Sequence, residues 1–172
     1  VPPLARKYRL PVYMTPGTFR SRDLGKLPFL HLIEGYQSLS FDHLEVLPVA
    51  VPHDAREPAQ FVFQGNNKRL GILTDLGNIS AHVEQHFCDC DGLLLEANHD
   101  PHMLASGPYP QTLKQRVGGP WGHLSNQQAA GFLARVDSDR LKQLVVGHIS
   151  QKNNSLERAK EVLSDVTRPI ES

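Results

Sequence analysis

The stretch Leu-Leu-Leu-Glu-Ala-Asn-His-Asp, residues 93–100, decides the fold. Three consecutive leucines are typical of a strand that is covered on both faces, as in the sheets of α/β proteins. The strand ends at Glu96, and burying an unpaired carboxylate costs free energy. We therefore expect Glu96 to take part in chemistry at the edge of the sheet. The structural alternative is a buried ion pair with Arg116 or Lys114.

Three other hydrophobic runs end in a residue that can bind a metal ion. They are Val-Pro-His-Asp-Ala (residues 51–55), Leu-Thr-Asp-Leu-Gly (73–77) and Val-Val-Gly-His-Ile-Ser (145–150). Imidazole nitrogens and carboxylate oxygens hold zinc and similar cations at about 2.0–2.2 Å. Singly, these residues have ordinary interpretations as a loop histidine, a turn or capping aspartate and a core histidine. Together they predict that His53, Asp75 and His148 are metal ligands.

The segment Trp-Gly-His-Leu-Ser-Asn, residues 121–126, places His123 just before an expected helix N-terminus. A carboxylate beside a histidine orients the ring, sets its tautomer and raises its basicity. Glu96 and His123 are therefore candidates for catalysis by proton transfer. Simple capping, or packing beside Trp121, is the alternative for His123.

Four polar residues near these positions are candidate substrate contacts: Asn98, His99, Ser125 and Asn126. The last two begin the expected helix, whose free backbone N–H groups can hold an anionic oxygen. His99 lies with His102 on a polar, proline-containing segment, and a solvated loop explains both histidines equally well.

Strands and helices alternate along the chain, which predicts an α/β fold. The expected strands are residues 11–14, 29–33, 40–51, 60–64, 68–74, 93–95 and 144–146. The expected helices are residues 4–8, 18–24, 80–87, 125–136 and 155–166. The Gly-Asn-Asn segment at residues 65–67 predicts a hairpin turn between two of these strands.

The composition indicates one globular domain over residues 1–172, with 40% apolar and 21% charged residues. Eighteen basic residues balance 18 acidic ones, so bulk charge draws the chain neither to nucleic acid nor to a membrane. No apolar run approaches the roughly 18 residues of a spanning helix, and the first residues do not resemble a signal peptide. We therefore expect a cytoplasmic protein, with Cys88 and Cys90 as reduced thiols.

Six short motifs occur in the order of a known family. They are His-Asp-Ala (53–55), Thr-Asp-Leu-Gly (74–77), Glu-Ala-Asn-His-Asp (96–100), Gly-Pro-Tyr-Pro (107–110), Gly-His-Leu-Ser-Asn (122–126) and Gly-His-Ile-Ser (147–150). In this order they resemble the YycJ (WalJ) branch of the metallo-β-lactamase-fold hydrolases, which is related to ribonuclease Z. The resemblance spans nearly the whole chain.

The resemblance implies a four-layer αββα sandwich with two divalent metal ions, zinc or manganese or iron, in a cleft between the sheets. It implies hydrolysis of a phosphodiester by a metal-activated water, with DNA as the substrate and a 5′ end as the starting point. His53 and His148 match histidine ligands, and Asp75 matches the carboxylate that bridges the metals. Glu96 and His123 match a pair that protonates the leaving oxygen.

One family feature is missing from the chain. The signature His-x-His-x-Asp-His should precede residues 4–13, and it does not occur there. We therefore expect a fragment of a longer protein, an N-terminally incomplete sandwich that binds metal poorly and is inactive by itself. Exposed apolar sheet surface should make it unstable, or should pair it with a second copy as a homodimer or with the missing segment.

Other functions remain open at the level of the sequence. The same metal site could act on a small phosphodiester, a thioester or a lactam. A non-catalytic binding or regulatory module on the same scaffold would also fit the missing signature. For a nucleic-acid substrate, the candidate phosphate contacts are Arg56, Lys114, Arg116 and Lys152, although a solvated charged face explains them equally well.

Overall fold

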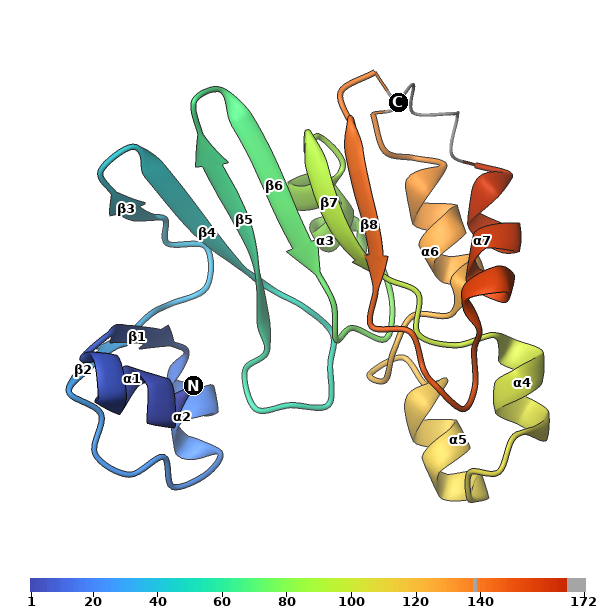
Figure 1. Ribbon diagram of the computed structural model, residues 1–172, viewed down its shortest axis with the longest axis horizontal. Coiled ribbons are helices and arrows are strands. Elements are labelled where there is room, and N and C mark those ends of the chain that lie inside the picture. Colours follow the sequence, from blue (N-terminus) through green and yellow to red (C-terminus); the bar gives the residue numbers. More distant parts are fainter. Residues whose placement is uncertain (138, 167–172) are drawn as a thin grey trace.

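The computed structural model describes residues 1–137 and 139–166, and Figure 1 shows their arrangement. The strands are β1 (Pro11–Met14), β2 (Phe29–Leu32), β3 (Leu39–Phe41), β4 (Leu44–Ala50), β5 (Ala59–Gly65), β6 (Lys68–Leu73), β7 (Gly92–Glu96) and β8 (Gln143–Gly147). The helices are α1 (Pro2–Tyr8), α2 (Pro16–Arg20), α3 (Ala81–Phe87), α4 (Pro101–Ser106), α5 (Gln111–Val117), α6 (Asn126–Leu133) and α7 (Leu156–Ser164).

The main sheet has the strand order β3-β4-β5-β6-β7-β8. The pairs from β3 to β6 are antiparallel, whereas β6, β7 and β8 run parallel to one another. The carboxyl ends of these three parallel strands therefore meet at one edge, the lower edge in Figure 1. Residues that follow them in the chain are brought together there, as happens at the carboxyl edges of other open α/β sheets.

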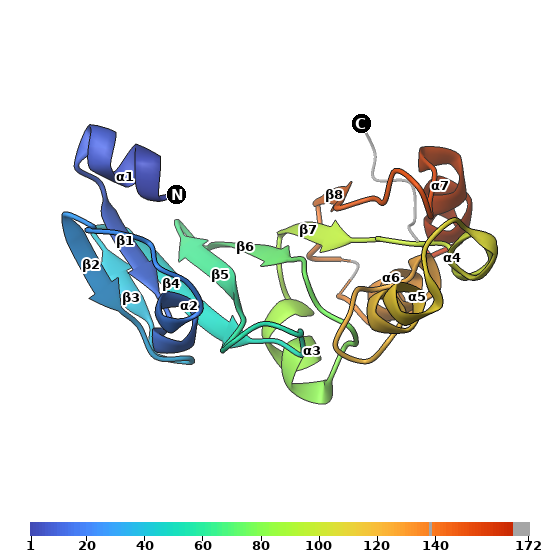
Figure 2. The same ribbon diagram turned by 90° about the horizontal axis from the view of Figure 1, so that it is seen from below.

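A hydrophobic core fills the space between the main sheet and its helices. Leu93 and Leu95 of β7 are buried, and Phe87 of α3 and Phe132 of α6 belong to the same cluster. Figure 2 shows α3 and α6 on the same side of the sheet. Helix α7 contributes Leu163 to this core. The helices thus cover the face of β7 to which Leu93 and Leu95 belong.

The opposite face of the parallel strands is apolar and partly open to solvent. Ile72, Leu94 and Val145 are register partners across β6, β7 and β8, and so form a row. Val145 is 59% exposed and Leu70 is 47% exposed, while Ile72 and Leu94 are half-buried. The prediction that the leucine strand is covered on both faces is thus met on the helix side only, among the described residues.

The N-terminal segment forms a separate small unit beside the half of the sheet that contains β3, β4 and β5 (Figure 1). Strands β1 and β2 pair in parallel, and α1 and α2 pack beside them (Figures 1 and 2). A hollow of about 450 Å³ lies between this unit and strand β5, with Tyr13 and Phe61 among its lining residues. Among the described helices, none combines the length and the hydrophobicity needed to cross a bilayer.

Two expected elements are different in the structure. The single strand expected over residues 40–51 is a hairpin of β3 and β4, because the chain turns at Asp42, which has a φ of 50°. The expected loop that carries His99 and His102 contains helices α4 and α5. Helix α4 begins at Pro101, a residue that fits the first helical turn, and the Asp100 side chain caps it by accepting the Met103 N–H.

The remaining expected elements are present with shifted ends. The helix expected over residues 18–24 is the shorter α2, which Thr15 caps. The turn between β5 and β6 has Asn66 and Asn67 at φ values of 50° and 57°, which is typical of a tight hairpin. Ser80, Ser125 and Ser155 each cap the helix that follows them.

Candidate metal and catalytic site

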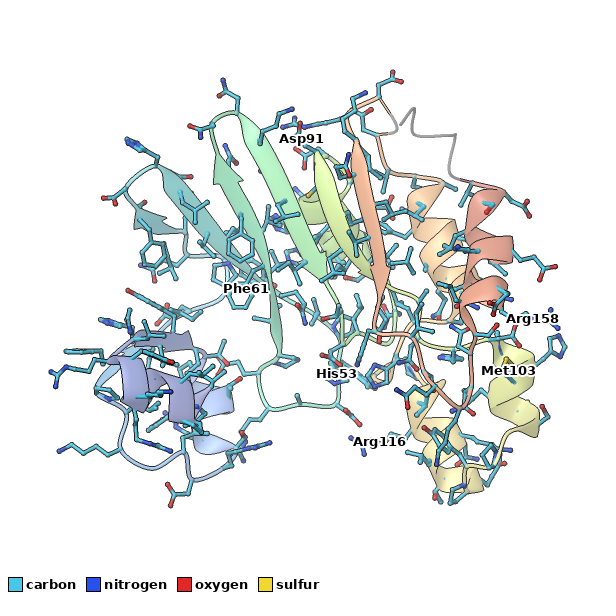
Figure 3. The ribbon with its side chains drawn as sticks, in the orientation of Figure 1. His53, Phe61, Asp91, Met103, Arg116 and Arg158 are labelled. Carbon is cyan, nitrogen blue, oxygen red and sulfur yellow. The ribbon has the colours of Figure 1, made fainter. Side chains whose placement is uncertain are left out.

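Five ionisable side chains gather at the carboxyl edge of the parallel strands. Asp75 follows β6, Glu96 ends β7 and His148 follows β8, while His53 and His123 come from loops beside them. The Asp75 Oδ1 atom lies 3.6 Å from His148 Nδ1, 3.7 Å from His123 Nδ1 and 4.0 Å from His53 Nε2. Figure 3 shows His53 at this edge. The structure thus brings together the three predicted metal ligands and the predicted catalytic pair.

Glu96 organises two of the histidines. Its Oε1 atom lies 2.7 Å from Nδ1 of His123 and 2.7 Å from Nδ1 of His148. A carboxylate can only accept, so both rings donate from Nδ1 and keep Nε2 free for an ion or a substrate. The other oxygen, Oε2, accepts the backbone N–H groups of Leu76 at 3.2 Å and Leu124 at 3.5 Å.

These contacts also determine the charge state of Glu96. Burial by itself raises the pKa of Glu96, but the hydrogen bonds from His123 and His148 outweigh it and leave the pKa below its ordinary value. The same hydrogen bond raises the pKa of His148. Arg116 is paired with Asp54, and Lys114 donates to the Ala105 carbonyl, so the partners of Glu96 are the two histidines and not the two basic residues suggested from the sequence.

The loop that carries His53 is attached to the segment before His123. His53 Nδ1 lies 2.9 Å from the Gly122 carbonyl oxygen, and the Asp54 N–H donates to the Trp121 carbonyl at 2.8 Å. Arg116 forms an ion pair with Asp54 and lowers the pKa of that carboxyl. These contacts hold the two loops, and hence the two histidine rings, in a fixed relation.

The backbone at the site adopts conformations that ordinary residues rarely use. Asp75 has a φ of 51° and His148 has a φ of 55°. Such left-handed conformations cost free energy and cluster at functional sites. Gly77 has a related constraint, since a side chain there would lie 2.4 Å from the Pro120 backbone. The chain therefore holds Asp75 and His148 in place against a local conformational preference.

Three of the four predicted substrate contacts line hollows: Asn98 lines one beside His123 and His148, and His99 and Ser125 line another. The Asn98 amide donates to the His148 carbonyl at 2.9 Å, and the Asn126 amide pairs with that of Asn154 at 3.0 and 2.8 Å. Ser125 caps α6, and His99 is buried with a pKa lowered by that burial. Asn126 is fully buried, so its position supports a structural role. Substrate contact by these four residues stays a prediction.

The hydrogen bond between Glu96 and His148 was not predicted from the sequence. The sequence did contain a signal for it, because both residues lie at the ends of hydrophobic runs that were expected to be strands. Only the pairing of β7 with β8, in which Glu96 is the partner of Gly147, places the two side chains next to each other.

Comparison with known proteins identifies the class. The family described as Beta-lactamase superfamily domain matches residues 6–149, and the chain belongs to this family. It is similar to exodeoxyribonuclease YycJ of Bacillus anthracis, with 34% identity over 169 residues that cover 95% of this chain and 63% of that protein. It is also similar to exodeoxyribonuclease WalJ of Streptococcus pneumoniae strain D39, with 36% identity over 162 residues that cover 91% of this chain and 60% of that protein.

Solved structures confirm the metallo-β-lactamase fold. The metallo-β-lactamase-fold protein YhfI of Bacillus subtilis superposes with a TM-score of 0.66 at 12% identity, covering 91% of this chain and 57% of that one. Zinc-bound PqqB of Methylobacterium extorquens gives a TM-score of 0.61 at 18% identity, covering 90% and 57%. The chain spans 60–63% of the length of the curated relatives named above. Its described residues form the six-stranded main sheet with helices on one face, and the separate two-stranded sheet of β1 and β2.

The cluster is chemically suited to a divalent cation. Donor atoms of Asp75, Glu96, His123 and His148 all lie within 4.8 Å of one another, and His53 Nε2 is near Asp75. Imidazole nitrogen and carboxylate oxygen are the ligand types that zinc and related metals take in proteins. Glu96 is already engaged with two rings and two backbone N–H groups, and the Nδ1 atoms of His123 and His148 are engaged with Glu96. Asp75 and the Nε2 atoms of the histidines are therefore the freer donors.

Proposed function

We propose that this domain belongs to a metal-dependent phosphodiesterase that hydrolyses DNA from an end. The observation that carries the proposal is the convergence of His53, Asp75, Glu96, His123 and His148 at one sheet edge. The names of two relatives, both exodeoxyribonucleases, support DNA as the substrate. Family membership supports a hydrolase that uses a metal.

In this proposal His53, Asp75 and His148 hold the metal, which is zinc, manganese or iron. Two such ions fit the family, in which the His-x-His-x-Asp-His signature supplies further ligands. A bound divalent cation lowers the pKa of water and stabilises negative charge on a phosphoryl oxygen. Asp75 and His148 keep a left-handed backbone that costs free energy, which supports a functional role for both residues.

The chain's own proton chemistry depends on Glu96 and His123. His123 donates from Nδ1 to Glu96 and so keeps Nε2 available toward the substrate. The buried carboxylate stabilises the protonated imidazole, which can then give a proton to the leaving oxygen. Glu96 is therefore a positioning residue, and His123 is the proposed proton donor.

The test is cleavage of single-stranded DNA labelled at its 5′ or its 3′ end by the full-length protein. The label that is released first gives the direction of digestion. We expect His148→Ala to abolish cleavage while the circular dichroism spectrum stays unchanged. His43→Ala is the matched control, because His43 is exposed in the turn between β3 and β4. Unchanged cleavage in His148→Ala would remove His148 from the site.

A further inference from the structure

A hollow of about 330 Å³ lies beside the two histidines that Glu96 orients. His123 and His148 line it, together with Tyr109 and Lys152. The Lys152 Nζ atom lies 6.0 Å from the centre of the Tyr109 ring. This volume is at the lower end of the roughly 300–1,000 Å³ that small-molecule sites occupy. The hollow is therefore large enough for a small part of a substrate whose reacting bond faces His123.

The backbone that carries Lys152 is held firmly. The Ser150 N–H donates to the Asn98 carbonyl at 2.9 Å, and the Asp100 N–H donates to the Asn153 carbonyl at 2.9 Å. The Ser150 hydroxyl accepts the N–H groups of Lys152 at 3.4 Å and Asn153 at 3.2 Å. These contacts join the segment to the residues that follow β7. The backbone of Lys152 is therefore fixed next to the carboxyl edge of the parallel strands.

The positive charge of Lys152 is available to bind an anion. No carboxylate lines the hollow, and no ion pair joins Lys152 to an acidic residue within residues 1–137 and 139–166. Arg116, another candidate phosphate contact, is instead paired with Asp54. An ammonium group beside an aromatic ring suits a nucleotide, because the cation can bind phosphate and the ring can stack on a base.

We propose that this hollow is a nucleotide subsite, in which Lys152 binds the phosphate next to the scissile one and Tyr109 stacks on its base. The inference rests on the proposed function, because it places this nucleotide beside the phosphodiester bond whose leaving oxygen His123 protonates. The phosphate is either a terminal 5′-phosphate or an internal phosphodiester of the same strand. Both are anions that the Lys152 ammonium group can bind, and the experiment below distinguishes them.

The experiment measures binding without cleavage. The full-length protein, in excess chelator, is added to a 3′-labelled oligothymidylate that carries either a 5′-phosphate or a 5′-hydroxyl. Fluorescence anisotropy of the label gives the affinity at several salt concentrations. We expect Lys152→Ala to weaken binding several-fold and to reduce the salt slope by about 0.7, as for the loss of one phosphate contact on a single strand. Lys152→Arg should restore the slope, and Tyr109→Leu should weaken binding without changing it.

Lys142→Ala is the matched control. It removes the same charge from an exposed lysine just before β8, whereas Lys152 follows that strand. Loss of the preference for the 5′-phosphate in Lys152→Ala would identify a terminal phosphate, whereas equal weakening of both oligonucleotides would identify an internal one. A Lys152→Ala protein that matches Lys142→Ala in affinity and slope would overturn the inference. If Lys152→Ala shows the expected loss of affinity but the unmodified protein cleaves no DNA when metal is added, the proposed function fails and the nucleotide subsite stands.

Discussion

Glu96 shows how much of the site can depend on one residue. Its two carboxylate oxygens accept two imidazole N–H groups and two backbone N–H groups, and the side chain has no exposure to solvent. Such partners behind a metal site fix the tautomer and orientation of the histidines. The geometry of His123 and His148 is therefore a consequence of one buried charge at the end of β7.

Replacing Glu96 by glutamine tests this dependence. Glutamine keeps the shape but loses the charge, and its NH₂ group would face either the two donor rings or the two backbone N–H groups. We expect zinc affinity to fall by about 10–100-fold and cleavage by about 10²–10⁴-fold. Isothermal titration with zinc and a cleavage assay measure the two effects. Glu161→Gln is the control, because this carboxylate is exposed on α7, and equal affinities in both variants would contradict the role of Glu96.

Asp91 gives a pH-dependent prediction at the opposite edge of the sheet. Hydrogen bonds from the Lys68 ammonium and the Arg69 N–H, both at 2.9 Å, lower the pKa of Asp91 to about 2, against an ordinary 3.8. A lowered folded-state pKa stabilises the protein above the ordinary value and loses that effect as the pH falls toward 2. We expect Asp91→Asn to be less stable than the unmodified protein above about pH 4, with the difference shrinking below it. Urea unfolding at several pH values checks this, and a constant difference would contradict it.

At the scale of elements, much of the arrangement was predictable because hydrophobic runs and capping serines are local signals. The runs that end near His53, Asp75, Glu96 and His148 predicted which side chains reach the sheet edge. The sequence showed that Glu96 and His148 both end hydrophobic runs, but it did not show that they are neighbours, because strand register depends on contacts between distant parts of the chain. Helix α4 was missed because the proline-containing segment with His99 and His102 was interpreted as a loop, although a proline such as Pro101 at the first turn favours a helix.

The capping of α6 leads to a prediction that separates structure from substrate binding. The Ser125 hydroxyl accepts the Gln128 N–H at 3.2 Å, and the Gln128 side chain accepts the Ser125 N–H at 2.8 Å. Ser125→Ala should therefore lower the free energy of unfolding by about 0.5–2 kcal/mol. Ser155→Ala is the matched control, since Ser155 caps α7 by accepting the Arg158 N–H. A KM for DNA that rises in Ser125→Ala but not in Ser155→Ala would instead show that Ser125 contacts substrate.

At the scale of the whole molecule, the main sheet has two different faces. Helices α3 and α6 bury one face, whereas Leu70, Ile72, Leu94 and Val145 leave the other apolar and partly exposed. A neighbouring hollow of about 690 Å³ is lined in part by further apolar side chains, those of Phe41, Leu44 and Phe63. Contiguous apolar surface of this kind drives association in water.

The chain of 172 residues, expressed alone, should therefore associate with a second copy through this face. The double variant Leu70→Thr and Val145→Thr should shift the sedimentation coefficient toward that of a monomer. It replaces the two most exposed of these four apolar side chains with β-branched polar ones that still favour a strand. Leu156→Thr is the control, since Leu156 is 53% exposed at the start of α7, away from this face. Circular dichroism shows whether each variant keeps its fold. A folded monomer of the unmodified chain at micromolar concentration would contradict the prediction, and it would mean that the open face is tolerated in water by a single copy.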